Sequence, residues 1–327
     1  MRHVIKHQRL CWSSLVWAMF LIILPLRLFR RGYGTVIVTV QGLDLESLLH
    51  HRAAAVRKTI TTMPDPNHLH YPSSYEKPDG TRGQKQRRGF CNWIVPHRVM
   101  IGQYPGQNPE VTGPSKDDVQ THIQSILQQA GITMFCCLQS ELPAQDDDHD
   151  DAWGEKGEIY LEPQYRRQNF PHPFTRYAPL VRSINPHCTF LHAPIEDLSV
   201  PHSQSLQRLL LQLLDALVEE HDPSTEQQNQ QQQQKQQPQK ASRVIYIHCW
   251  GGRGRAGLVG SCLLSLLWPE WNADQILNLI QAGYDTREGA DQMPPALSQS
   301  PQTESQRQFV RAFVQRRQQQ FLMLGQN

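Results

Sequence analysis

The chain has 327 residues, with 32 Lys and Arg against 30 Asp and Glu, so its net charge is only +2. Charged residues make up 19% and apolar residues 39%, both below the globular averages of roughly 25% and 45–50%, and 39 glutamines fill part of the gap. The sequence has no regular glycine period and only one long apolar run, which excludes a collagen-like repeat and a polytopic membrane protein. It also argues against a scaffold held by disulfides, since the 7 Cys are odd in number and widely spread, and it gives no general attraction to nucleic acid.

The amino terminus contains one apolar run, residues 12–26, with Arg and Lys on both sides. A membrane span needs about 17–25 such residues, so the run is at or below that limit. We predict that residues 1–34 are a targeting or anchor segment that contacts the membrane through residues 10–29. A signal anchor, a cleaved targeting segment and an interfacial or buried helix all remain open.

Three polar stretches interrupt the rest of the chain. Residues 35–88 are predicted to be a poorly ordered linker, whose His68 and His70 lack a matching zinc-ligand pair. Residues 145–155 hold the acidic run 146–148, which is typical of a solvated loop, with a cation site as the alternative. Residues 224–241 are rich in glutamine and almost without apolar side chains, so we expect both of these inserts to be disordered.

The remaining chain, residues 89–323, alternates between strand and helix patterns. Strands are predicted at 93–95, 98–103, 132–138, 189–195 and 244–248, and helices at 116–130, 203–221, 257–268, 272–281 and 304–322. Ser115, Ser203 and Asn272 are the expected helix caps, and Gln275 completes a capping box with Asn272. This alternation predicts one α/β domain with a central, mainly parallel sheet flanked by helices.

One segment within this domain has the residues needed for chemistry. The apolar strand 244–248 ends at His248 and is followed by Cys249, a glycine-rich turn, and Arg255 at the start of an apolar helix. Such a turn lets backbone N–H groups converge on an anion, and the helix start adds positive potential. Arg255 can donate two parallel hydrogen bonds to phosphate, and the same field favours the thiolate form of Cys249.

The spacing His-Cys-(five residues)-Arg between a strand and a helix resembles the active-site loop of the protein tyrosine and dual-specificity phosphatase superfamily. The sequence HCWGGRGR is most similar to plant and algal members, as is the segment 92–105. An inert buried cysteine and a rhodanese-type sulfur-transfer loop are the alternatives. The resemblance implies that the phosphate would be bound by the loop residues Trp250, Gly251, Gly252, Arg253 and Gly254, together with Arg255.

The resemblance also implies two further elements. Asp197, in the sequence HAPIEDLSVP, would be the general acid on a mobile loop, with Glu196 as the neighbouring alternative. Gln302 would position the hydrolytic water and Gln306 would support it, unless Ser300 or Thr303 simply caps the last helix. His248 would hydrogen-bond near the thiolate. No metal or other cofactor is implied.

The sequence departs from the family at Ala256, where most members have a hydroxyl that helps the sulfur leave. We expect a phosphatase acting on phosphorylated protein with dual specificity, through a cysteinyl-phosphate intermediate. Arg253 favours a phosphoinositide or inositol phosphate as the alternative substrate, and a phosphate-binding pseudophosphatase or adaptor is a further alternative. Because a thiolate is easily oxidised, the expected location is a membrane anchor with the catalytic domain in the cytosol, or else an organelle reached after cleavage.

Overall fold

The chain divides into two units, Met1–Leu43 and Asp44–Asn327. The computed structural model describes residues 45–60, 63–78, 85–110, 112–142, 158–159, 173–218 and 243–324, all in the second unit. The predicted targeting segment 1–34 and both predicted inserts, 145–155 and 224–241, lie outside the described residues. Among the helices that are described, none combines the length and apolar character that a bilayer crossing requires.

A five-stranded sheet forms the centre of the second unit, in the order β3-β4-β9-β5-β8. The strands are β3 (Cys91–Val95), β4 (Val99–Gly102), β9 (Ile245–His248), β5 (Met134–Gln139) and β8 (Thr189–Ile195). Only the pair β3–β4 is antiparallel, and β4, β9, β5 and β8 run parallel to one another. The predicted α/β fold with a mainly parallel sheet is therefore confirmed.

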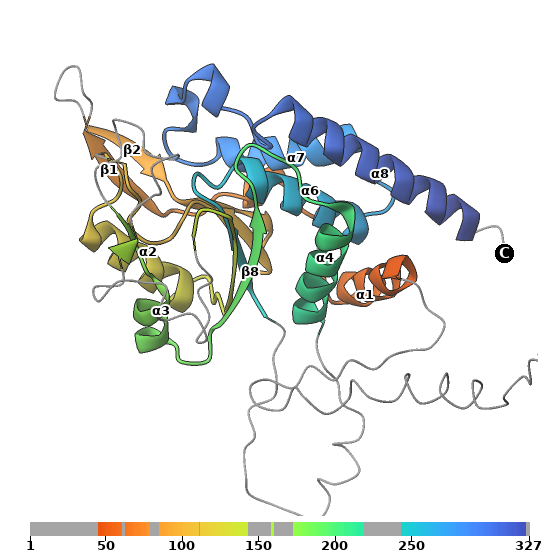
Figure 1. Ribbon diagram of the computed structural model, residues 1–327, viewed down its shortest axis with the longest axis horizontal. Coiled ribbons are helices and arrows are strands. Elements are labelled where there is room, and N and C mark those ends of the chain that lie inside the picture. The colour runs from red at the N-terminus through yellow and green to blue at the C-terminus, as the bar shows by residue number, and fades with distance from the viewer. Residues whose placement is uncertain are drawn as a thin grey trace, which may run out of the picture. The chain divides into compact units, whose positions relative to one another are not determined.

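Helices cover both faces of this sheet. Figure 1 shows α2 (Lys116–Gln128) and α3 (Ala178–Ile184) on one side and α4, α6, α7 and α8 on the other. These last four helices span Ser203–Leu217, Gly254–Leu267, Ala273–Asp285 and Glu304–Leu324. Because both faces are covered, the central strands read as continuous apolar runs, and every residue of β5 and β9 is buried. Cys136 and Cys137 of β5 lie in this core, as predicted.

Local capping chemistry explains where two of these helices begin. Ser115 caps α2, and Asn272 forms the predicted capping box with Gln275 at the start of α7. The predicted cap at Ser203 is wrong. Extended backbone at His202 makes that residue the cap, Ser203 is already helical, and α4 ends at Leu217 rather than at residue 221.

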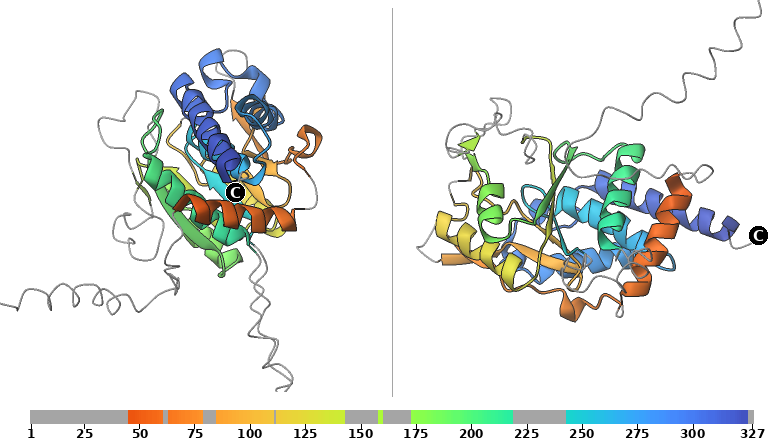
Figure 2. Two further views of the ribbon diagram at one scale, coloured as in Figure 1. Left: turned by 90° about the vertical axis from the view of Figure 1, so that its right-hand side faces the viewer. Right: turned by 90° about the horizontal axis from the view of Figure 1, so that it is seen from below.

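The largest difference from the sequence prediction lies in residues 35–88, which were expected to be a poorly ordered linker. Their described part contains helix α1 (Leu45–Thr59) and a hairpin of β1 (Ser74–Pro78) and β2 (Lys85–Gly89). Leu49, Ala53 and Val56 form a narrow buried stripe on α1, which packs against α4 and α6 (Figure 2). Charged and histidine residues around this stripe lower the mean hydropathy of the segment. For this reason the sequence pattern did not indicate a packed helix.

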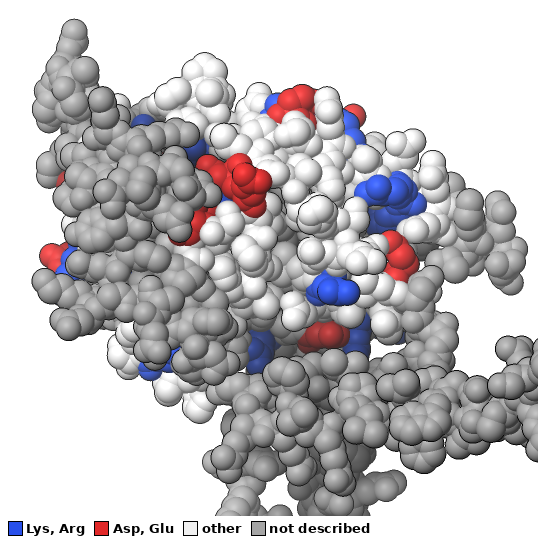
Figure 3. Space-filling view, viewed as in Figure 1, with Lys and Arg blue, Asp and Glu red and all other residues white. Residues whose placement is uncertain are grey.

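Short elements complete the second unit. A two-stranded pair joins β6 (Glu158–Ile159) to β7 (Phe174–Thr175), and single 3-10 turns lie at Pro66–His68, Ala290–Gln292 and Pro295–Leu297. On the face drawn in Figure 3, acidic and basic side chains of the described residues occur in small separate groups. This scatter agrees with the near-neutral net charge of the chain.

Candidate active site

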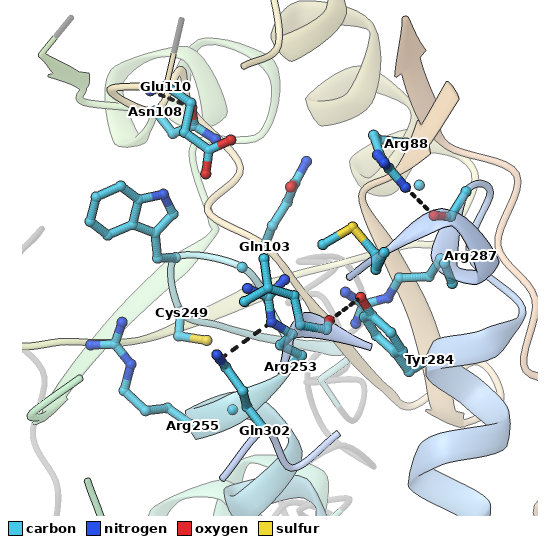
Figure 4. A pocket seen from close by; sticks show the side chains of 18 of the residues that line it. Arg88, Gln103, Asn108, Glu110, Cys249, Arg253, Arg255, Tyr284, Arg287 and Gln302 are labelled. Carbon is cyan, nitrogen blue, oxygen red and sulfur yellow. Dashed lines mark hydrogen bonds between the residues drawn. The ribbon is translucent and has the colours of Figure 1, made fainter. Parts of the chain in front are cut away.

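The predicted nucleophile loop lies between β9 and α6, where the sheet meets the first turn of the helix. Helix α6 begins at Gly254, three residues earlier than the sequence predicted, so Arg255 lies within its first turn. Cys249 is 3% exposed and Arg255 is 1% exposed. Figure 4 shows the two side chains next to each other at the base of a pocket. The helix amino terminus therefore points its free N–H groups toward the thiol.

The backbone carbonyls of the loop are bound from outside it. Three of them accept hydrogen bonds: Trp250 O from the Tyr104 amide at 3.0 Å, Gly252 O from Arg287 at 2.9 Å and Arg253 O from the Ser300 hydroxyl at 2.9 Å. In a trans peptide the carbonyl and the following N–H point in opposite directions. The N–H groups of Gly251, Arg253 and Gly254 therefore face away from these donors, which is the arrangement that an anion-binding loop needs.

Gly252 is the one loop glycine whose conformation excludes other residues. Its φ is +68°, and a Cβ atom there would overlap the backbone of Gly102 and Gln103. The loop can therefore lie directly against the end of β4 only because residue 252 has no side chain.

Arg287, which the sequence analysis missed, holds the loop from below. It follows α7, is 5% exposed, and donates to Gly252 O, to Ile101 O at 3.1 Å and to Asn92 Oδ1 at 2.8 Å. Its three acceptors are neutral, and burial lowers the pKa of the guanidinium below its usual value. Arg287 thus ties the ends of β3 and β4 to the loop, and no local sequence pattern announces this role.

Glu141 is the second residue that the sequence analysis missed. Its carboxylate accepts two hydrogen bonds from Arg255, at 2.6 and 2.8 Å, and both side chains are 1% exposed. Burial alone would lower the pKa of Arg255, but the hydrogen bonds that it donates to Glu141 and the nearby charges of Cys249, Glu141 and Asp197 raise it. Glu141 follows β5 at the carboxyl edge of the parallel sheet, and this position was the signal that could have identified it.

The predicted acid loop follows β8 and reaches the same edge. Asp197 Oδ1 lies 3.1 Å from the second guanidinium nitrogen of Arg255, and its side chain is 46% exposed. Asp197 also lines the pocket, whereas the neighbouring Glu196 uses its backbone carbonyl to hold the turn through Ser199. Of the two candidate acids, Asp197 is therefore the one whose carboxylate meets the loop.

Gln302 and Gln306 both line the pocket but do different things there. Gln302 Oε1 accepts a hydrogen bond from Arg253 at 3.3 Å. Gln306 is fully buried, donates to the backbone of Ser199 at 3.1 Å, and accepts from the Thr303 amide at the start of α8. Gln306 thus connects α8 to the acid loop, while the Gln302 side chain remains at the pocket surface.

His248 contacts the hydroxyl of Tyr177 in addition to the backbone of Cys249. Its Nε2 lies 2.7 Å from the hydroxyl of Tyr177, and the ring is fully buried. Burial, helped by the nearby His192 and Arg255, lowers the pKa of His248 to about 3. The ring is therefore neutral at ordinary pH, and it anchors the end of β9 rather than adding charge near the thiolate.

Two buried histidines should make the fold sensitive to acid. Burial lowers the pKa of both His122 and His248 from 6.5 to about 3. The unfolded chain therefore binds more protons below pH 6.5, and stability falls as the pH drops toward 3. Between pH 7 and pH 5, each histidine should lower the free energy of unfolding by about 2 kcal/mol.

Urea unfolding at pH 7 and pH 5 measures this loss. We expect His122→Gln to remove about half of the pH dependence, and the exposed His68→Gln to leave it unchanged. Equal unfolding midpoints at the two pH values would show that these histidines do not resist protonation in the folded state.

The pocket above Cys249 has a volume of about 330 Å³. Its walls come from the nucleophile loop, the acid loop, the start of α8, and the β1–β2 hairpin (Figure 4). No group of three or more potential metal-ligating side chains occurs in the part of the chain that the structure describes.

Residues 176–321 match a family model described as the "Swiss Army Knife protein, DSP-PTPase phosphatase domain". No curated protein matches the chain. The structure is similar to that of PTPMT1 in complex with PI(5)P, with a TM-score of 0.39 and 12% identity over 71% of this chain and 98% of that chain. It is also similar to kinase-associated phosphatase with its catalytic cysteine replaced by serine, with a TM-score of 0.39 and 16% identity over 76% and 95% of the two chains.

A further similar structure is that of TpbA from P. aeruginosa, with a TM-score of 0.35 and 13% identity over 76% of this chain and 96% of that chain. The finer resemblance of the HCWGGRGR loop to plant and algal members stays a prediction. The family match begins before the acid loop, includes Cys249 and Arg255, and ends within α8. Residues 176–321, which include the candidate site, are therefore similar to the phosphatase domain of the dual-specificity and tyrosine phosphatases.

Proposed function

We propose that this domain hydrolyses phosphate monoesters through a cysteinyl-phosphate intermediate and without a metal ion. The observation that carries the proposal is the position of Cys249 under inward-facing loop amides and beside Arg255. A phosphate bound there would place three oxygens against the N–H groups and the guanidinium, with phosphorus facing the sulfur.

The first step forms the S–P bond and breaks the P–O bond to the leaving group. The Cys249 thiolate supplies the electron pair, and Asp197 in its protonated form gives a proton to the departing oxygen. Asp197 contacts Arg255 at 3.1 Å, so a bound phosphate would replace that carboxylate. Glu141 then keeps the guanidinium in place from the other side.

The second step reverses these roles for water. Asp197, now a carboxylate, takes a proton from a water molecule that attacks phosphorus, and the S–P bond breaks to give inorganic phosphate and the Cys249 thiolate. The Gln302 amide, which lines the pocket, is our candidate for orienting this water. Ala256 is fully buried and has no hydroxyl to assist the leaving sulfur, so we expect this step to limit turnover.

For the substrate, we propose phosphoprotein with dual specificity. Half exposure of Asp197 and the exposed Leu198 beside it place the acid near the surface, where short phosphoserine and phosphothreonine side chains can reach it. We further propose that residues 10–29 attach the protein to a membrane, with the domain in the reducing cytosol. If protease protection showed that the domain is enclosed in an oxidising compartment, that location would be contradicted.

Replacement of Asp197 by Asn tests the acid. We expect kcat to fall by about 10²–10⁴-fold with phenyl phosphate, whose leaving group needs a proton. The loss should be smaller with p-nitrophenyl phosphate, which has a more acidic leaving group. Full-length protein assayed with a chelator present gives both values.

The matched control is Glu196→Gln, one residue away in the same loop. It should retain wild-type kcat with both substrates. A large loss in Glu196→Gln together with a wild-type Asp197→Asn protein would transfer the acid role to Glu196.

A further inference from the structure

We propose that the β1–β2 hairpin forms a second phosphate-binding subsite at the far end of the same pocket. Its residues are Lys77, Arg88 and Gln103. The inference rests on the proposed hydrolysis of the first phosphate and, for the substrate, takes the alternative to phosphoprotein: a compact molecule that carries at least two phosphates. The hairpin lies before the family match at residues 176–321, so the family model does not assign this subsite.

The register of the hairpin places both cations on one face. Tyr75 pairs with Arg88, and Lys77 pairs with Gln86. Since side chains alternate along a strand, these four residues share a face, and Glu76 and Arg87 occupy the other. Tyr75, Lys77 and Arg88 all line the pocket. Tyr75 is 4% exposed and packs on Phe90, with ring centroids 5.0 Å apart, which fixes the hairpin to the core.

Among the described residues, Arg88 has hydrogen-bond partners but no charge partner. Its guanidinium donates to Gly289 O and to Gln86 Oε1, both neutral, and in the described residues its buried Nε has no partner. No carboxylate in the same described part of the chain forms an ion pair with it. Its positive charge therefore remains available to an anion in the pocket.

Lys77 and the nearby carboxylates do not cancel this charge. Lys77 Nζ is 3.9 Å from Glu110, a distance at the limit of an ion pair, and both side chains are about one-third exposed. Glu288, the other carboxylate at this end, is bound by Arg87 at 3.1 Å and by the Ser74 hydroxyl at 3.0 Å. A doubly charged phosphate can displace the weak Lys77–Glu110 contact.

Gln103 supplies a buried donor between the two ends of the pocket. Its side chain lies between Arg88 and Cys249 in Figure 4, and the residue is 9% exposed. The Tyr75 hydroxyl is its polar neighbour, yet Nε2 has no acceptor within hydrogen-bond distance among the described residues. A buried donor without a partner costs about 1–3 kcal/mol, so a ligand oxygen placed there would be favoured.

These groups select a ligand by the spacing of its phosphates. One phosphate would lie over Cys249 and a second between Lys77 and Arg88, with Arg253 from the loop at the pocket surface between them. Both ends belong to one cavity of about 330 Å³, which suits a phosphorylated ring better than two phosphorylated residues of a peptide. The chemistry is shared by a soluble inositol polyphosphate and by a phosphoinositide headgroup.

The test compares ligands with one and several phosphates on the full-length protein. Inositol hexakisphosphate, phosphatidylinositol bisphosphate in phosphatidylcholine vesicles and a doubly phosphorylated peptide are compared with p-nitrophenyl phosphate. In the Lys77→Gln/Arg88→Gln variant we expect the ratio of kcat/KM for an inositol substrate to kcat/KM for the aryl phosphate to fall at least tenfold. Lys116→Gln, an exposed lysine on α2, should leave this ratio at its wild-type value.

The single variant Lys77→Gln controls for misfolding, because within the described residues the Lys77 side chain makes one long polar contact, with Glu110. It should lower the ratio at least threefold. If the ratio falls with both the soluble and the vesicle substrate, the subsite recognises the phosphorylated ring itself. If it falls with the vesicle substrate only, the ligand is the headgroup of a lipid. An unchanged ratio in both variants, or loss confined to the doubly phosphorylated peptide, would overturn the subsite.

A binding measurement separates the subsite from catalysis. Calorimetric titration of the Cys249→Ser protein with inositol hexakisphosphate should show at least tenfold weaker affinity when Lys77 and Arg88 are also replaced. If no monoester is hydrolysed by the wild type, the proposed function fails while this binding difference still supports the subsite. Equal affinities overturn the subsite even if hydrolysis is observed.

Discussion

Replacing Cys249 with serine is expected to abolish turnover while leaving phosphate binding nearly intact. A serine hydroxyl remains protonated at neutral pH, and the nearest buried imidazole, that of His248, already binds the Tyr177 hydroxyl. The Nε2 atom of His248 is therefore not available to take the hydroxyl proton. Loss of a nucleophile typically lowers kcat by about 10⁴-fold or more. The loop amides and Arg255 are unchanged, so affinity for inorganic phosphate should stay within about threefold.

Hydrolysis of p-nitrophenyl phosphate and calorimetric binding of phosphate measure the two effects. Cys188→Ser is the matched control, because Cys188 is also a buried cysteine but lies just before β8, outside the pocket. It should keep wild-type kcat. Persistent activity in Cys249→Ser would refute the cysteinyl-phosphate mechanism. A wild-type protein that binds phosphate but releases none would instead favour the pseudophosphatase alternative that Ala256 raises.

The sequence predicted the part of the site that is local in the chain. Cys249, its glycines and Arg255 lie within one strand–turn–helix unit, so their spacing alone defines the loop. Asp197 was identified because its segment, directly after a predicted strand, resembles the acid loop of the phosphatase superfamily. The strand and helix order was predictable for a similar reason, since buried parallel strands are continuous apolar runs and capping residues mark helix starts.

Residues that act through long-range contacts were not predictable. Glu141 meets Arg255 across 114 positions and Arg287 meets Gly252 across 35. In the sequence, Glu141 borders an acidic stretch and Arg287 follows a helix end, and both patterns are typical of exposed residues. The same bias made α1 and the hairpin look like a linker, because their buried residues are a minority among charged ones. As a result, Lys77 and Arg88 were absent from the predicted pocket.

Replacement of Glu141 by Gln should produce the largest loss of stability of any change at the site. The guanidinium of Arg255 is 1% exposed, and Glu141 provides its buried negative charge through two hydrogen bonds. Glutamine keeps one acceptor but no charge, which leaves the half-exposed Asp197 as the remaining anion near Arg255. Removing one partner of a buried pair costs about 3–5 kcal/mol, a large part of the 5–15 kcal/mol typical of a domain.

Urea unfolding of wild type and Glu141→Gln measures this cost, and added phosphate identifies its cause. A phosphate dianion bound in the loop restores negative charge beside Arg255, so 50 mM phosphate should raise the melting temperature more in the variant than in the wild type. The exposed pair Glu304–Arg307 gives the control, because Glu304→Gln should leave the urea midpoint close to its wild-type value. If Glu141→Gln unfolds at the wild-type urea concentration, Arg255 does not depend on Glu141 for its position. The account of how Arg255 is held ready for phosphate would then be wrong.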